Sequence, residues 1–223
     1  MLLACPRTSF NRWLAVNKPM PLAAVDLEKP RTPAELRAFV EHVRDRVRAN
    51  RSEFELGMAK QGHYKKFLDE VQPLCNFAEV AYPADHKVQP VLGNQGFDAI
   101  VFDAQGNEID KVEFAKPYDG ATAAANARQV VVRGYSDMQV SDHTEVLNEF
   151  VPFFEATSKA KSRKDYSGVT VVFALAAPPA LGGTEAVFER QVERLKSIIA
   201  ANKFKAKRVF LYVPHGRLQQ IDG

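Results

Sequence analysis

The chain has 223 residues, of which 46% are hydrophobic and 26% are charged, and its formal net charge at pH 7 is +3. This composition is ordinary for a globular protein, and nothing in it points to a disordered, collagen-like or solenoid chain. No apolar run approaches the roughly 20 residues that a membrane-spanning helix needs, and the N-terminus lacks the pattern of a secretory signal. The two cysteines, Cys5 and Cys75, are far apart. We therefore expect a reduced, cytoplasmic protein without a zinc site.

The first segment, residues 1–31, has four prolines and no sustained periodicity, which predicts a poorly ordered N-terminal arm. Thr32 then begins a helix, because Pro33 follows at the first helical position and Glu35 stands at capping-box spacing. Apolar residues at helical intervals carry this helix to about Asn50.

A second helix is predicted over about 52–81, kinked or divided at Pro73, with Cys75 as a small buried hydrophobe. Strands follow at 88–92, 97–102 and 109–115, and the last two flank a turn at 104–107 that is typical of a hairpin. Helices at 120–133 and 141–161, a strand at 169–176, a helix at 184–201 and a strand at 208–213 complete the chain.

The last two strands are joined through a helix, which predicts that they lie parallel in one sheet with helices on its faces. Their nearly continuous apolar character favours burial on both sides. The sequence thus predicts the α/β class, with three α/β/α layers around a mixed sheet. We expect the arm at 1–31, an N-terminal helix at 32–52 and an α/β domain at 53–223.

The hairpin has a register that can be worked out from its turn. If residues 105 and 106 form a two-residue turn, or 104–107 a four-residue loop, opposed residue numbers sum to 211 and Asp98 lies opposite Glu113. Opposed side chains project to the same face about 5 Å apart. Two carboxylates this close repel each other unless a cation or a shared proton compensates. A divalent ion such as Mg²⁺ takes carboxylate oxygens, so the pair is a candidate half-site; the alternative is two strand-end carboxylates that are solvated or paired with lysines.

Two lysines flank Glu113 in the predicted strand. Lys111 is two residues before Glu113 and shares its face, whereas Lys116 is displaced by three residues and points to the other face.

An acidic residue enters the first strand of the hairpin at Gly96-Phe97-Asp98-Ala99-Ile100-Val101, and after a short turn the second strand carries Lys111-Val112-Glu113-Phe114-Ala115. A helix and a strand follow. This order of elements around the hairpin resembles the PD-(D/E)XK restriction-endonuclease-like superfamily. The resemblance covers about residues 53–213. It implies a nuclease core in which Asp98 and Glu113 hold Mg²⁺ and act in catalysis. Glu70, in Phe67-Leu68-Asp69-Glu70, matches a further acid that a preceding helix contributes, and the residues from Lys159 into the strand at 169–175 match the helix-to-strand step.

The chain departs from the family pattern where a lysine should follow Glu113 by two residues, because Ala115 stands there. Alanine can neither donate a hydrogen bond nor stabilise a developing charge. Lys111 or Lys116 could supply the cation, with Lys111 as the candidate catalytic residue. A relative that does not cut is equally allowed by this departure.

A basic run lies near the second half of the core and contains Lys159, Lys161, Arg163 and Lys164, with Tyr166 close by. Such a run can bind nucleic-acid phosphates and stack a base, although it is also typical of a solvated helix end. Two functions follow as expectations. One is a Mg²⁺-dependent nuclease that acts on DNA rather than RNA; the other is an inactive nuclease-fold module that binds nucleic acid or a protein partner.

Overall fold

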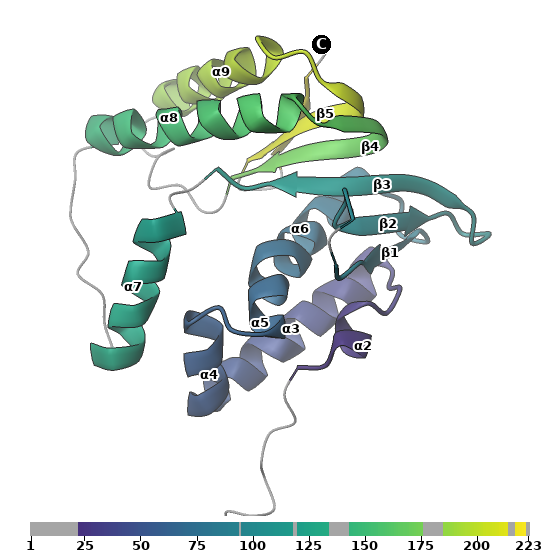
Figure 1. Ribbon diagram of the computed structural model, residues 1–223. Coiled ribbons are helices and arrows are strands. Elements are labelled where there is room, and N and C mark those ends of the chain that lie inside the picture. The colour runs from purple at the N-terminus through teal and green to yellow at the C-terminus, as the bar shows by residue number, and fades with distance from the viewer. Residues whose placement is uncertain are drawn as a thin grey trace, which may run out of the picture.

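The computed structural model describes residues 22–93, 95–117, 120–133, 143–175, 185–213 and 217–221, and centres on a six-stranded sheet (Figure 1). The strands lie in the sheet in the order of the sequence. They are β1 Lys87–Pro90, β2 Ala99–Phe102, β3 Glu108–Ala115, β4 Asp165–Ala174, β5 Lys205–Val213 and β6 Arg217–Gln220.

The sheet is mixed, as predicted. Strands β1, β2 and β3 pair antiparallel, β3–β4 and β4–β5 pair parallel, and β5–β6 pair antiparallel. The parallel pairing of β4 and β5 confirms the crossover expected from the sequence. The sequence did not predict β6, a four-residue edge strand with three polar residues and no alternating apolar pattern.

The hairpin register is also confirmed over the regular part of β2 and β3. Ala99 pairs with Val112 and Val101 with Asp110, so the paired numbers sum to 211. A bulge shifts the register by one residue between Val101 and Phe102, on the turn side. The bulge does not reach the other end of the hairpin, where the two predicted site residues lie.

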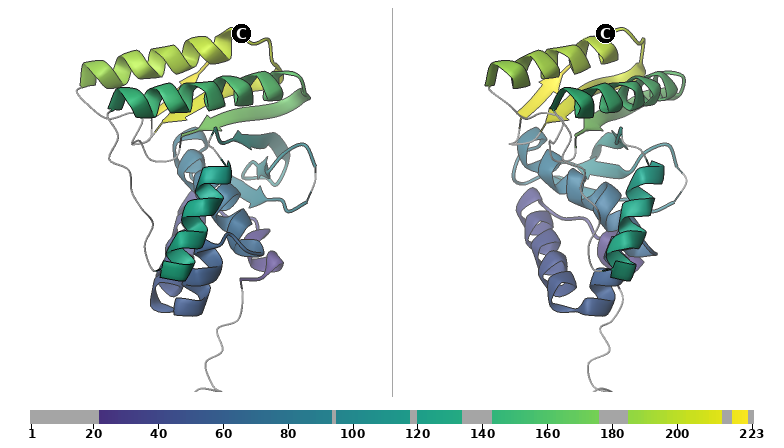
Figure 2. Two further views of the ribbon diagram at one scale, coloured as in Figure 1. Left: turned by 60° about the vertical axis from the view of Figure 1, so that its left-hand side comes forward. Right: turned by 90° about the vertical axis from the view of Figure 1, so that its left-hand side faces the viewer.

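Helices cover both faces of this sheet (Figures 1 and 2). One face packs against α3 Pro33–Ala49 and α6 Gln72–Ala81, and its cluster includes Cys75, which is buried as predicted. The other face packs against α8 His143–Ser162 and α9 Glu185–Ala200 through Phe154, Val192 and Leu195. The other helices of the described residues are α2 Ala24–Leu27, α4 Arg51–Met58, α5 His63–Lys66, the π-helix η1 Phe67–Val71 and α7 Gly120–Arg133. Helix α7 lies beside α4.

The first long helix begins as its sequence predicts. The Thr32 hydroxyl accepts from the Glu35 N–H at 3.3 Å, and the Glu35 carboxylate accepts from the Thr32 N–H at 2.9 Å. Both bonds of the capping box are therefore formed. Leu36 and Val40 of α3 pack in the same hydrophobic cluster as Phe77 of α6. Helix α3 therefore packs on the α/β domain.

The helix predicted over 52–81 is divided, but the break lies at residues 59–62 rather than at Pro73. The chain leaves α4 after Met58 through Lys60 and Gly62, both in the left-handed region with φ of 49° and 54°. It then re-enters helix through α5 and η1, and Pro73 lies in the first turn of α6. The π-helix η1 ends just before Pro73. In a regular α-helix the ring of Pro73 would clash with the carbonyl four residues earlier, and the wider π turn gives that ring more room.

The prediction of a poorly ordered arm over residues 1–31 is wrong for residues 22–31. Leu22 and Leu27 are buried in the α3–α6 cluster. Arg31 forms a β-bridge with Val88 through N–O distances of 3.0 and 2.7 Å, and its guanidinium lies 3.9 Å from the Phe39 ring centroid. Burial of these two leucines orders the segment, although its sequence has no periodic pattern of apolar residues. Residues 1–21 lie outside the described residues.

None of the helices within the described ranges has both the length and the apolar character needed to cross a bilayer.

Candidate functional site

The two acids of the hairpin lie side by side. Asp98 directly precedes β2, and its backbone N–H donates to the Val112 carbonyl at 2.7 Å. Its carboxylate Oδ2 accepts from the Phe114 N–H at 2.8 Å. These two bonds reach the residues on either side of Glu113, so the backbone of β3 holds Asp98 alongside that residue.

The surroundings of Asp98 disfavour its charged form. The pKa of Asp98 is raised to about 7, first because the carboxyl is buried and second because Glu113 places a like charge beside it. The charge of Glu70 acts in the same direction. The Phe114 N–H and the Lys161 ammonium oppose this rise in pKa but do not cancel it.

Glu113 is 9% exposed and has a cationic partner from another part of the chain. Its Oε1 forms an ion pair with Nζ of Lys161, in the last turn of α8, and the Tyr166 hydroxyl lies 3.4 Å from the same oxygen. Burial of Lys161 opposes its charge, but the hydrogen bond and charge of Glu113 outweigh this and raise the pKa of Lys161. A lysine 48 residues away in sequence thus stands beside Glu113.

Helix η1 brings two further acids toward this pair. Glu70 pairs with Lys66 at 2.6 Å, and Asp69 pairs with Lys60 at 2.9 Å. A π-helical turn inside a run of α-helix is often found at functional sites. Here it carries both acids within one turn.

Lys116 closes the group from the end of β3. Its ammonium donates to the Leu68 carbonyl at 2.9 Å and lies 3.7 Å from Asp69. Burial lowers the pKa of Lys116 to about 8, against the raising effect of Asp69. We call this group the acid–lysine cluster; it consists of Asp69, Glu70, Asp98 and Glu113 with Lys60, Lys66, Lys116 and Lys161, so its formal charges balance.

Another buried acid shows what a purely structural carboxylate looks like in this fold. Asp110 accepts hydrogen bonds from the Tyr82 hydroxyl at 2.9 Å and from the Thr170 hydroxyl at 3.0 Å. Arg208 forms an ion pair with it, and Lys207 lies 3.4 Å away. Asp110 therefore has two cations and two hydroxyls, whereas Asp98 has a neighbouring carboxylate and one backbone N–H.

The predicted catalytic Lys111 does not stand with the acids. It pairs with Glu108 at 3.2 Å, and its ammonium lies 5.1 Å from the Phe97 ring centroid. The alternation of side chains along the strand predicts that Lys111 shares a face with Glu113. The Lys111 ammonium pairs instead with Glu108, which lies three residues earlier on the same strand. The cation beside Glu113 is Lys161 instead.

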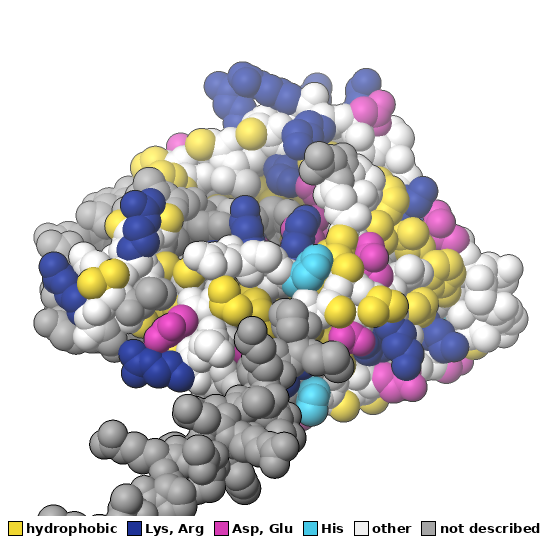
Figure 3. All heavy atoms as spheres, turned by 60° about the horizontal axis from the view of Figure 1, so that its bottom comes forward, with side chains coloured by type: hydrophobic (Ala, Val, Ile, Leu, Met, Phe, Trp, Pro, Cys, Tyr) yellow, Lys and Arg dark blue, Asp and Glu magenta, His cyan; other side chains and the backbone are white. Residues whose placement is uncertain are grey.

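The basic run predicted for nucleic acid is divided by the fold. Lys159, Arg163 and Lys164 are exposed, whereas Lys161 turns inward to Glu113. On the face shown in Figure 3, lysine and arginine side chains lie in several separate groups, with acidic and apolar side chains between them. A single continuous basic surface is not seen on that face.

The predicted three-acid metal set is not assembled. Over the described ranges, no group of three or more His, Cys, Asp or Glu side chains is arranged to hold a metal ion. Asp98 and Glu113 form a pair, and Glu70 influences the pKa of Asp98 but is engaged with Lys66.

The contact of Lys66 with Glu70 and the contact of Tyr166 with Glu113 are not among those predicted from the sequence. Lys66 and Glu70 are four residues apart, a spacing that brings side chains together on a helix, so this pair was detectable. Tyr166 and Lys161 reach Glu113 only through the packing of α8 and β4 on β3. No local pattern indicates such a contact.

Comparison with protein-family models, curated proteins and solved structures finds no match to this chain.

Proposed function

We propose that this chain is a metal-dependent nuclease of restriction-endonuclease-like fold, which hydrolyses phosphodiester bonds in DNA with Asp98 and Glu113 as ligands of Mg²⁺. The observation that carries the proposal is the pairing of the half-buried Asp98 with the buried Glu113, presented by a hairpin next to parallel strands. Two carboxylates at this position reduce the stability of the fold through desolvation and mutual repulsion, and a structural role does not require them.

The residues fit a hard divalent cation in part. Mg²⁺ is commonly bound through one or two carboxylates while it keeps several waters, which is what Asp98 and Glu113 offer. When bound, it would polarise a phosphate oxygen and lower the pKa of a coordinated water. Glu70 is the acid nearest to a third position, and Lys66 would have to release it.

Lys161 takes the role that Ala115 cannot fill. Its ammonium is fixed on Glu113 and has a raised pKa, so it stays charged at neutral pH. A fixed positive charge at this place stabilises negative charge that develops on a phosphate. The exposed Lys159, Arg163 and Lys164 extend from the same region and can contact the phosphates of a bound strand.

A cleavage assay tests this proposal. Purified chain is incubated with supercoiled plasmid, linear duplex and single-stranded DNA in Mg²⁺ or Mn²⁺, beside Asp98→Asn and Glu113→Gln. Both variants should lose at least about a hundredfold in rate, which is the scale of charge stabilisation at active sites. Asp103→Asn, in the exposed hairpin turn, is the matched control. Absence of cleavage by the wild type, or equal cleavage by all four proteins, would refute the nuclease proposal.

Metal binding can be measured without activity. At a dissociation constant of about 1 mM, 10 mM Mg²⁺ would stabilise the wild type by about 1.4 kcal/mol. The same addition should leave Asp98→Asn unchanged when both are unfolded with urea at pH 8. An equal increase in the free energy of unfolding of both proteins would show that Mg²⁺ binds at a site that does not need Asp98.

A second candidate is an inactive module of the same fold that binds nucleic acid or a protein partner. It is favoured by Ala115 and by the ion pair that already neutralises Glu113. In that case DNA would bind without being cut, and neutralising Lys159, Arg163 and Lys164 would reduce the slope of log affinity against log salt by about one per residue.

A further inference from the structure

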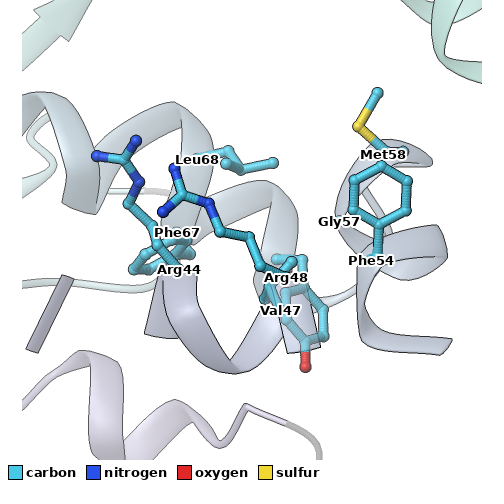
Figure 4. Close-up of a pocket in the computed structure, with 9 residues that line it drawn as sticks. Arg44, Val47, Arg48, Phe54, Gly57, Met58, Phe67 and Leu68 are labelled. Carbon is cyan, nitrogen blue, oxygen red and sulfur yellow. The ribbon is translucent and has the colours of Figure 1, made fainter. Parts of the chain in front are cut away.

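A pocket separate from the Asp98–Glu113 pair opens between α3, α4 and the start of η1 (Figure 4). Its volume is about 150 Å³. An apolar cavity of about this size can admit a benzene ring. The lining residues are Arg44, Val47, Arg48, Phe54, Gly57, Met58, Tyr64, Phe67 and Leu68.

The wall of this pocket is apolar even where a polar residue contributes to it. The Tyr64 hydroxyl donates to the Glu53 carboxylate at 2.6 Å, so Tyr64 has no unpaired donor to offer a ligand. Glu53 itself is buried and also accepts from Arg46 at 2.9 Å. Phe54 is 42% exposed, so it leaves apolar surface open to solvent. The wall therefore favours a ring or a short branched chain.

The mouth has the opposite character. Arg44 and Arg48 are four residues apart on α3, a spacing that puts both side chains on one side of the helix, and both line the pocket in Figure 4. Arg48 pairs with the exposed Asp45 at 3.4 Å. In the described part of the chain, the Arg44 side chain forms no hydrogen bond or ion pair. Two positive charges beside an apolar hollow are complementary to a ligand with an anionic head and an apolar body.

We propose that this pocket binds a small amphipathic acid: a phenyl-sized ring or a short branched chain that carries one carboxylate. The ring fills the space between Val47, Phe67 and Leu68, and the carboxylate pairs with Arg44 and Arg48. Binding here does not depend on the nuclease proposal, because no acid of the hairpin lines the pocket.

The probe is phenylacetate, titrated into the full chain and followed by ligand-observed and ¹H–¹⁵N NMR. With ten non-hydrogen atoms it should bind with a dissociation constant on the order of 1 mM. Benzyl alcohol keeps the ring without the charge, and acetate keeps the charge without the ring. Both should bind at least about threefold more weakly than phenylacetate. Equal binding of acetate and phenylacetate would overturn the proposal.

Two variants separate the two parts of the pocket. Arg44→Gln with Arg48→Gln should weaken phenylacetate at least about threefold and leave benzyl alcohol within about twofold. Gly57→Ala should weaken both ring ligands, because its added methyl lies in ordinary contact 3.8 Å from Val47 Cγ1 and narrows the space without a clash. Arg51→Gln is the matched control, since this exposed arginine does not line the pocket. No binding at 20 mM, or an unchanged affinity in the double-arginine variant, would overturn the proposal.

Discussion

Replacing Asp98 by asparagine is expected to stabilise the folded chain at alkaline pH, and to do so less at acidic pH. The pKa of Asp98 is raised to about 7 by burial and by the charge of Glu113, whereas an aspartate in an unfolded chain titrates near about 3.9. The folded chain therefore holds this proton more tightly than the unfolded chain. Its stability falls as the pH rises from about 4 through about 7, and the full loss is present above that range.

The size of the effect follows from the two pKa values. A rise of about three units corresponds to about 4 kcal/mol of lost stability at pH 8.5. About 1.5 kcal/mol of this is already lost at pH 5, where the unfolded carboxyl is ionised, and about 2.5 kcal/mol is lost between pH 5 and 8.5. Asparagine resembles a neutral aspartic acid, and its oxygen can still accept from the Phe114 N–H. The advantage of Asp98→Asn over the wild type should therefore grow by about 2.5 kcal/mol over that interval.

Urea unfolding followed by circular dichroism at pH 5, 7 and 8.5 measures this difference. Asp103→Asn is the control with the opposite sign, since hydrogen bonds from Asn107 and Gln105 lower the pKa of Asp103. That variant should lose nearly the same stability at pH 5 and pH 8.5, because a carboxyl whose pKa is lowered by folding is almost fully ionised in both the folded and the unfolded chain over this interval. An advantage of Asp98→Asn that stays constant with pH, or shrinks toward pH 8.5, would refute the placement of Asp98 beside Glu113.

Three further outcomes are expected. Lys161→Met leaves a buried carboxylate without its cation and should cost about 2–4 kcal/mol in urea unfolding at pH 7.5, whereas Lys159→Met, at an exposed position, should stay within about 0.5 kcal/mol. Thr32→Ala removes the capping box and should lower the free energy of unfolding by about 1 kcal/mol, read from the urea midpoint. Burial raises the pKa of Cys75 to about 11, so in a Cys5→Ser background Ellman's reagent should react with it only after denaturant unfolds the chain.

The features that could be predicted from the sequence depend on residues close to one another along the chain. The capping box of α3 needs only Thr32 and Glu35, and both of its bonds are present. The register of β2 and β3 follows from one short turn, so the pairing of Ala99 with Val112 could be calculated. The α/β class and the parallel β4–β5 pair follow from the order of elements. In each case one local geometry determines the outcome.

The features that could not be predicted depend on contacts between distant segments. The break near Gly62 interrupts a continuous apolar periodicity and divides the segment into separate helices. The glycine is the local sign of this break. Leu22 and Leu27 are ordered by burial against α3 and α6, which no local pattern signals. The sequence places Lys161 in an exposed basic run, because its contact with Glu113 joins residues 48 positions apart.

The burial of Ala115 explains why a helix, rather than β3 itself, supplies the cation beside Glu113. The two residues are two positions apart on β3 and so share a face, and Ala115 is 1% exposed in the cluster that contains Phe154 and Phe173. A lysine at position 115 would place its ammonium under α8 among aromatic rings, and burying an unpaired charge there is costly. Lys161 lies in the last turn of α8, where the helix dipole also favours a cation. Alanine at position 115 therefore allows α8 to pack closely on β3. The positive charge beside Glu113 comes from Lys161 of that helix.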